Sequence, residues 1–305
     1  MRVFSKSAFA LLLGFVFTPC AFAQPAWLSN EESINAFRSQ VESLKPAVSK
    51  YAHVRAVDLQ VPLEGRQIAI RVYDSDDRKP KPTIVYVHGA CWVAGSLESH
   101  DEISRYLASE SGAKVIAIDY RLAPEHAYPS GHNDVFESTV WLWDHARELG
   151  IDKSKFAIGG ESAGAYFAAA TVLRSIDNSN SPQFAFLLTV YAALDGGGSS
   201  WTECKDNYFA LEEDSRSRYG SPLWADNLAG MPPTYSIFAE LEISRAEQEL
   251  FVHKLREQAV DAHAYMHAGV GHDVVNWARV DGDLTAHKQA IKFINAGFGD
   301  AERPD

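Results

Sequence analysis

The pentapeptide Gly160-Glu161-Ser162-Ala163-Gly164 constrains the fold of this chain more than any other segment. It follows the apolar stretch 155–159 and leads into a helix-forming run over 163–175. A Gly-x-Ser-x-Gly turn between a strand and a helix places its serine on a tight elbow, because glycines without a Cβ let the strand and the helix approach closely. The pattern therefore predicts that Ser162 is presented as a nucleophile.

The segments around this turn alternate between strand and helix patterns. Apolar residues at three- and four-residue spacings predict a helix over 30–49, and alternating residues predict strands at 54–61 and 68–72 around a turn at Glu64-Gly65. The other expected strands are 83–88, 114–119, 155–159, 184–190, 234–239 and 262–267, and the other expected helices are 98–110, 132–149, 163–175, 244–259 and 284–297. This order predicts an α/β fold with an eight-stranded, mostly parallel sheet covered by helices on both faces.

The first 23 residues have the pattern of a secretory signal peptide. Arg2 and Lys6 precede an apolar run over 8–17, and Ala21 and Ala23 are the small residues that cleavage after Ala23 requires. The apolar run is too short to span a bilayer. The alternatives are a retained membrane anchor and a lipid on Cys20, which Pro19 disfavours. Cleavage leaves residues 24–305, for which we expect a single domain that is periplasmic or secreted.

The net charge limits the kinds of partner. The full chain carries a formal net charge of −12, and loss of the two cations in the signal peptide makes it −14. An acidic surface repels nucleic acid and anionic membranes. We therefore expect a small-molecule substrate, no nucleic-acid partner and no stable membrane association.

Cleavage would also leave two cysteines, Cys91 and Cys204, in a compartment where disulfides form. They either pair with each other or remain two unpaired, small buried residues. The sequence leaves both readings open.

A nucleophilic serine needs a base, and the base needs a carboxylate that orients it. His272 follows the last expected strand in the glycine-rich segment 269–273, where an imidazole can reach over the serine. In α/β-hydrolases the acid lies between the serine and the histidine. Glu240 and Glu242 both follow the strand 234–239, and only one of them can orient His272. The other is expected to cap or salt-bridge the helix that begins near Ser244.

The backbone donors of an oxyanion hole are expected in the loop after the strand 83–88. This loop reads His88-Gly89-Ala90-Cys91-Trp92. Its small residues let a substrate oxygen approach their N–H groups, whereas a plain turn would not require a glycine and an alanine ahead of a bulky tryptophan.

Several segments resemble signatures of the hormone-sensitive-lipase-like family of α/β-hydrolase esterases. Segment 87–92 with Gly95-Ser96 is similar to the His-Gly-Gly-Gly-Trp loop of that family, and segment 119–126, Asp-Tyr-Arg-Leu-Ala-Pro-Glu-His, matches its second signature closely. The serine turn resembles Gly-Asp-Ser-Ala-Gly. Ser221-Pro222-Leu223 and Pro232-Pro233 match later landmarks, so the resemblance extends from about residue 55 to the end.

The resemblance implies a role for each site residue. Ser162 attacks the ester carbonyl, His272 takes the serine proton and later gives it to the leaving alcohol, and the N–H groups of Gly89, Ala90 and Ala163 bind the oxyanion. The catalytic aspartate of the family, usually followed by Pro-Leu-Arg, falls on Glu242-Ile243-Ser244-Arg245, which selects Glu242 over Glu240. The family implies no metal and no cofactor.

The chain departs from the family pattern in the oxyanion loop and in the cap. Ala90 and Cys91 replace two glycines, although their backbone N–H groups remain. The cap segment is trimmed to about 195–220, with a second cap piece at about 28–50, which predicts a relatively open acyl pocket. A bridge between Cys91 and Cys204 would tie this cap to the site. Glu161 could influence the choice of alcohol or form a structural salt bridge.

The predicted activity is that of a serine carboxylesterase acting on small, short-chain acyl esters through an acyl-enzyme intermediate. Two alternatives remain: an amidase of the arylformamidase type, and a non-catalytic ligand-binding homologue of the same fold. The presence of a serine, a histidine and a carboxylate favours the enzyme.

Overall fold

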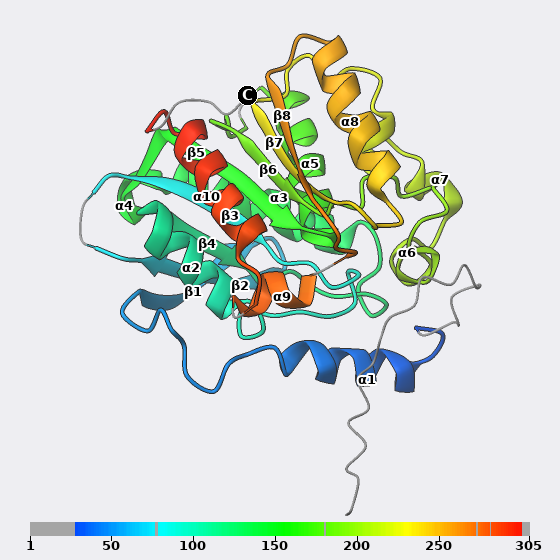
Figure 1. Ribbon diagram of the computed structural model, residues 1–305, viewed down its shortest axis with the longest axis horizontal. Coiled ribbons are helices and arrows are strands. Elements are labelled where there is room, and N and C mark those ends of the chain that lie inside the picture. The colour runs from blue at the N-terminus through cyan, green and yellow to red at the C-terminus, as the bar shows by residue number, and fades with distance from the viewer. Residues whose placement is uncertain (1–27, 77–78, 180, 273, 281, 301–305) are drawn as a thin grey trace, which may run out of the picture.

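The computed structural model describes residues 28–76, 79–179, 181–272, 274–280 and 282–300, so the predicted signal peptide at 1–23 lies outside the described residues. Eight strands form one twisted sheet in the order β1-β2-β4-β3-β5-β6-β7-β8 (Figure 1). β1 pairs antiparallel with β2, and β2 with β4, while all other neighbours pair in parallel. The predicted α/β-hydrolase fold is therefore confirmed.

The strands lie close to the expected segments. Their bounds are β1 Arg55–Leu63, β2 Arg66–Asp74, β3 Lys81–Val87, β4 Lys114–Ile118, β5 Ile151–Glu161, β6 Leu187–Val190, β7 Thr234–Ala239 and β8 Ala262–His267. The helices are α1 Glu31–Glu42, α2 Asp101–Ser111, α3 Ser130–Asp144, α4 Ala146–Leu149, α5 Ala163–Ile176, α6 Thr202–Tyr208, α7 Glu212–Ser215, α8 Arg245–Glu257, α9 Val274–Arg279 and α10 Thr285–Gly297, with a 3-10 turn at Pro222–Trp224.

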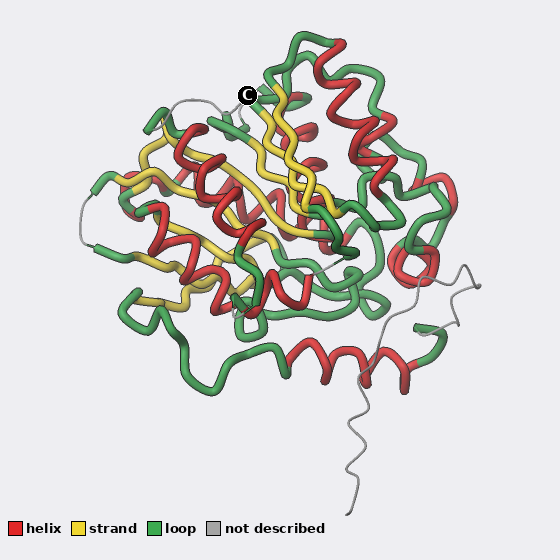
Figure 2. The backbone as a smooth tube through the Cα atoms, in the orientation of Figure 1, coloured by secondary structure: helices red, strands yellow, loops and turns green. Residues whose placement is uncertain are grey.

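Helices cover both faces of the sheet (Figure 2). The buried apolar residues form two cores, and alternate residues of the central strands belong to one or the other. Ile103 of α2 and Phe293 of α10 belong to one core, and Val135 of α3, Phe167 of α5 and Phe251 of α8 belong to the other. Both faces of the parallel strands are therefore buried, which explains why the central strands read as continuous apolar runs. None of the described helices is long and apolar enough to cross a membrane.

The structure differs from expectation mainly at helix ends and in the cap. The first helix ends at Glu42, shortly before Pro46, which lacks an N–H and restricts the residue before it. Val48, expected on the apolar stripe, is 81% exposed. The expected helix 132–149 is divided at His145 into α3 and α4. The short helices α6, α7 and α9 were not expected.

Candidate active site

Ser162 lies between the end of β5 and the start of α5, at the edge of the sheet where the parallel strands end. Its backbone has φ 52° and ψ −120°, a strained conformation for a residue with a side chain. A Cβ on Gly160 or Gly164 would overlap the carbonyl of Val87, so both glycines are needed for β5 and α5 to approach β3. The sharp elbow predicted from the pentapeptide is present.

The structure brings Ser162, His272 and Glu242 together. His272 Nε2 lies 2.9 Å from Ser162 Oγ, and His272 Nδ1 lies 2.7 Å from Glu242 Oε1. The carboxylate side chain is fully buried, while the imidazole is 14% exposed. An ionised carboxylate can only accept, so Nδ1 donates to Glu242 and Nε2 is left to accept the serine proton. This is the arrangement that a general base requires.

Glu240, the other carboxylate of this loop, is exposed and points elsewhere. Its Oε2 accepts a hydrogen bond of 2.7 Å from the N–H of Gly269. The expectation that the second carboxylate would cap or salt-bridge the following helix is therefore wrong. Glu240 instead connects the end of β7 to the glycine-rich loop that carries His272.

The oxyanion loop, which we define as residues 88–94, has three consecutive residues with left-handed backbone: Ala90, Cys91 and Trp92, at φ 77°, 58° and 60°. The N–H of Gly89 donates to Glu161 Oε1 at 2.5 Å. Gly89 was expected to be an oxyanion donor, and this bond corrects that expectation, because its N–H is already taken by a buried carboxylate.

Other N–H groups around the serine remain open. Within the part of the chain that the structure describes, the N–H groups of Ala90, Cys91 and Ala163 have no hydrogen-bond acceptor. Ala163 is the first residue of α5, whose N-terminus carries a partial positive charge. Open backbone donors at such a place suit a developing oxyanion.

Glu161 is fully buried beneath the oxyanion loop, between the serine elbow and the core. Besides the N–H of Gly89, it accepts a hydrogen bond from the hydroxyl of Tyr86, which in turn accepts one of 2.8 Å from Trp277 Nε1. His100 Nε2 lies 3.0 Å from Glu161 Oε1. The structure therefore supports the structural role that the sequence allowed for Glu161, because its contacts are with the protein core.

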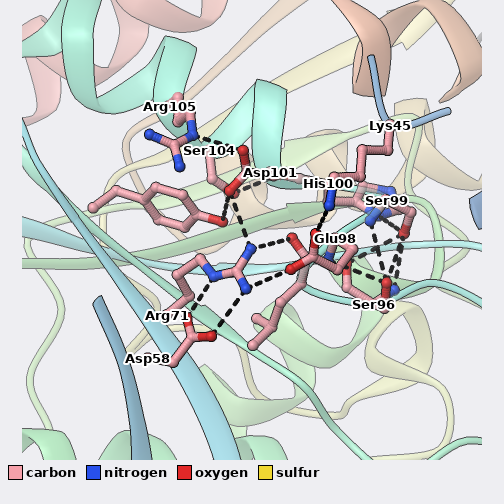
Figure 3. Close-up of polar contacts among 12 residues, drawn as sticks. Lys45, Asp58, Arg71, Ser96, Glu98, Ser99, His100, Asp101, Ser104 and Arg105 are labelled. Atoms are coloured by element: carbon pink, nitrogen blue, oxygen red, sulfur yellow. Dashed lines mark hydrogen bonds and ion pairs between the residues drawn. The ribbon is translucent and has the colours of Figure 1, made fainter. Parts of the chain in front are cut away.

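The segment that carries His100 is itself fixed by a cluster of charges at the start of α2. Arg71 donates to Asp58, Glu98 and Asp101 at 2.5, 2.6 and 3.2 Å (Figure 3). These carboxylates raise the pKa of the guanidinium above its ordinary value. Ser99 Oγ contacts His100 Nδ1 at 2.9 Å, which leaves Nε2 of that ring for Glu161.

Burial also changes the pKa of His88, the first residue of the oxyanion loop. His88 stacks on Tyr120 and His100, with ring centroids 4.3 and 5.2 Å apart. Burial, helped by the nearby His100, lowers the pKa of His88 to about 3. This imidazole therefore remains neutral beneath the loop at any pH near neutrality.

The trimmed cap is fastened to the oxyanion loop. Cys91 of the loop and Cys204 of α6 form a disulfide bond with Cα atoms 4.9 Å apart. The ring of Tyr208, at the end of α6, stacks on Trp92 at 5.2 Å, and Phe209 packs beside it. The cap segment is thus tied to the residues that flank the open N–H groups.

The other cap piece, α1, is fastened by Arg38. This guanidinium donates to the carbonyl of Val93 at 2.8 Å, to the carbonyl of Ala123 at 3.0 Å and to both oxygens of Glu125. Val93 belongs to the oxyanion loop, and Ala123 and Glu125 to the second signature segment. Arg38 thus joins α1 to both signature segments.

Three residues that contact the acid or its partners were not identified from the sequence. Trp201 lies against His272 with ring centroids 4.4 Å apart, and Ser244 donates to Glu242 Oε1 at 2.6 Å. Gln248 donates to the hydroxyl of Ser244. The available signal was Ser244, a serine two residues after the acid where the family pattern has leucine.

Among the described residues, no three His, Cys, Asp or Glu side chains converge as a metal site would require.

Comparisons with known proteins agree with this geometry. A family model described as alpha/beta hydrolase fold matches residues 84–276. An arylesterase of Saccharolobus solfataricus is 31% identical over 259 residues, which cover 80% of this chain and 85% of the relative. Esterase LipI of Mycobacterium tuberculosis is 30% identical over 277 residues, covering 85% and 86%.

A solved structure shows the same architecture. The hyperthermophilic esterase of Pyrobaculum calidifontis superimposes with a TM-score of 0.80 at 32% identity, covering 87% of this chain and 93% of that one. The motifs, the fold and these relatives agree. The chain therefore belongs to the α/β-hydrolase family, within the hormone-sensitive-lipase-like group of esterases that its motifs resemble.

Proposed function

We propose that this protein is a serine carboxylesterase that hydrolyses small esters with short acyl chains. The observation that carries the proposal is the position of His272, within hydrogen-bond distance of both Ser162 Oγ and the buried carboxylate of Glu242. The sequence relatives named as esterases support ester hydrolysis as the reaction.

In the first half of the reaction, Ser162 Oγ attacks the ester carbonyl while His272 Nε2 takes the hydroxyl proton. The carbonyl oxygen becomes an oxyanion, for which the open N–H groups of Ala90, Cys91 and Ala163 are the proposed donors. His272 then gives its proton to the departing alcohol, which leaves an acyl-enzyme on Ser162. Glu242 stabilises the imidazolium that forms and keeps its ring oriented.

In the second half, water replaces the alcohol. His272 takes a proton from the water as it attacks the acyl carbonyl, and returns that proton to Ser162 Oγ as the acid departs. Each proton transfer in both halves of the reaction thus uses the same atom, His272 Nε2. The acyl-enzyme divides one difficult displacement into two easier ones.

The packing beside the serine supports a short acyl group. Tyr166 lies one helical turn after Ser162, and its ring packs edge-on against that of Trp92, with centroids 5.4 Å apart. Tyr208 and Phe209 of the trimmed cap complete a buried aromatic cluster around these rings. Aromatic side chains therefore fill the space beside the nucleophile on the side of the cap, which supports a short acyl group.

The test is an acyl-chain-length series of p-nitrophenyl esters with the wild type and Ser162→Ala. We expect turnover to be highest at two to four acyl carbons and to be lost in Ser162→Ala, and a serine-directed phosphonate should label Ser162 in the wild type, as found by peptide mass spectrometry. Highest turnover on long chains would overturn the short-chain proposal. Faster turnover of matched amides would favour the amidase, and failure of the phosphonate to label Ser162 would favour a ligand-binding protein.

We further propose that cleavage after Ala23 exports the protein to the periplasm or the medium. The disulfide supports this location, because such bonds persist in oxidising compartments. N-terminal sequencing and intact mass of protein recovered from outside the cytoplasm test the proposal. The expected product begins at Gln24 and has no free thiol, and a product that retains residues 1–23 would contradict it.

A further inference from the structure

The acid loop, which we define as residues 240–245, holds its carboxylate through a single oxygen. Glu242 Oε1 accepts from both His272 Nδ1, at 2.7 Å, and Ser244 Oγ, at 2.6 Å. Among the described residues, Glu242 Oε2 has no hydrogen-bond partner although it is buried. The direction of this carboxylate therefore depends on the two groups that share Oε1.

Within the described part of the chain, the hydrogen atom of the Ser244 hydroxyl has one acceptor, Glu242 Oε1. Trp201 Nε1 and Gln248 Nε2 each lie 3.3 Å from Ser244 Oγ, and both groups can only donate. The amide of Gln248 cannot be turned around, because its Oε1 accepts the N–H of Ala192 at 3.1 Å. The serine oxygen thus accepts two hydrogen bonds, and its own hydrogen points to Glu242.

The backbone position of Ser244 makes this use of its hydroxyl unusual. Ser244 is the N-cap residue of α8, where a serine side chain ordinarily accepts a hydrogen bond from a backbone N–H of the first turn. Here the side chain makes no capping bond. Its fully buried hydroxyl donates to Glu242 instead of accepting a hydrogen bond from the first turn of α8.

We propose that Ser244 is the positioning residue of the acid: held by Gln248 and by Trp201 of the cap, it fixes the carboxylate of Glu242 toward His272. The inference rests on the proposed esterase function. A glutamate reaches one methylene further than an aspartate and has one more rotatable bond. The bond from Ser244 removes that freedom and stabilises the ionised carboxylate beside which His272 becomes charged.

The primary test is steady-state kinetics of Ser244→Ala, expressed per active site by phosphonate titration. A hydrogen bond to a charged group has the strength to change kcat by about 10- to 100-fold. We expect that loss in kcat with KM nearly unchanged, while Ser244→Thr, which keeps the hydroxyl, retains kcat within about threefold. Ser244→Gly, which is tolerated at an N-cap but has no hydroxyl, should lose as much kcat as Ser244→Ala.

Two further variants separate positioning from general damage. Ser200→Ala is the matched control, because this neighbouring, buried serine hydrogen-bonds the carbonyl of Ile243 at 3.5 Å and the side chain of Glu247 but not the carboxylate of Glu242. It should keep wild-type kcat. Trp201→Phe keeps a ring against His272 but removes one donor to Ser244, and we expect a loss of a few-fold in kcat.

A double-mutant cycle with Glu242→Asp gives the decisive readout. The shorter aspartate cannot keep both contacts, so Ser244→Ala should cost less than about threefold in that background. Equal losses in the glutamate and aspartate backgrounds, or an unchanged kcat in both Ser244→Ala and Ser244→Gly, would overturn the inference. If Ser162→Ala and Glu242→Ala are inactive while Ser244→Ala is fully active, only the inference fails; if Ser162→Ala retains turnover, the proposed esterase mechanism fails as well.

Discussion

The oxyanion loop lies beside Ser162 and the acid loop acts on Ser162 through His272, and the two loops are held by different chemistry. The oxyanion loop is supported by the buried carboxylate of Glu161, whose partners Tyr86 and His100 belong to the core of the fold. The carboxylate of the acid loop is held by a neutral donor, Ser244, which itself accepts a hydrogen bond from Trp201 of the cap. Both loops contact the cap, the oxyanion loop through the disulfide of Cys91 and the acid loop through Trp201, but the oxyanion loop also rests on a buried carboxylate of the core.

The largest effect is expected on the acid side, from Glu242→Ala. Without the carboxylate, nothing orients His272 or stabilises its charged form, so kcat should fall by about 10³- to 10⁴-fold. Glu240→Ala is the matched control, since its carboxylate contacts the N–H of Gly269 and should change kcat only a few-fold. Steady-state kinetics of both variants test the assignment, and a severe loss in Glu240→Ala with activity kept in Glu242→Ala would reverse it.

The next largest effect is expected beneath the oxyanion loop, from Glu161→Ala. The change leaves the N–H of Gly89 and the ring of His100 without their buried acceptor, which should destabilise the protein by about 3–5 kcal/mol. A displaced oxyanion loop should also lower kcat by about 10²-fold.

Chemical denaturation and kinetics measure the two losses separately. Glu161→Gln keeps the shape of the side chain and an acceptor for the N–H of Gly89. It should therefore lose less stability and less kcat than Glu161→Ala. If Glu161→Ala keeps wild-type stability and kcat, the oxyanion loop does not depend on this carboxylate.

A smaller effect on turnover is expected where the cap meets the oxyanion loop. Cys204→Ala opens a disulfide that spans 113 residues, which costs about 4–5 kcal/mol in the chain-entropy model. Because the aromatic contacts of Tyr208 remain, kcat should fall only a few-fold. Thermal melting and kinetics under oxidising conditions test this, and a wild-type melting temperature in the variant would contradict it.

The smallest effect concerns acid stability. His88, with its folded pKa near 3, binds no proton in the pH range where an unfolded histidine binds one, so it removes stability as the pH falls from about 6.5 towards 3. Asp119, whose pKa burial raises to about 6, acts in the opposite direction between about pH 6 and pH 4. Melting temperatures of the wild type and His88→Phe between pH 7 and pH 4.5 test the balance. We expect the variant to lose less stability on acidification, whereas equal slopes would exclude His88 as a source of acid sensitivity.

Much of the fold followed from the sequence, because the buried strands are apolar runs and the elbow has its own pattern. The strands β7 and β8 lie at the expected residues. The short helices of the cap escaped prediction because packing forms them: Trp201, just before α6, has a left-handed backbone that no local pattern signals.

The site was predictable where a side chain performs the chemistry and less so where backbone does. The serine elbow and the order serine, acid, histidine located Ser162, His272 and the pair Glu240 and Glu242, and the resemblance to the family signature then selected Glu242. The sequence did not reveal which backbone N–H groups of the oxyanion loop are free to bind the oxyanion. That depends on the side chain of Glu161, which accepts a hydrogen bond from the N–H of Gly89. Ser244 was missed for a similar reason, since its role is visible only once the orientations of its donors are known.

The double contact of Trp201 has a consequence for how this protein can diverge. The side chain belongs to the cap segment, yet it touches both His272 and Ser244. A substitution at position 201 that is selected because it admits a new substrate therefore also changes the surroundings of the catalytic base, His272. Variants that widen the entrance there should be accompanied by compensating changes at positions 244 or 248, whereas changes at exposed cap positions such as Leu211 leave the base untouched.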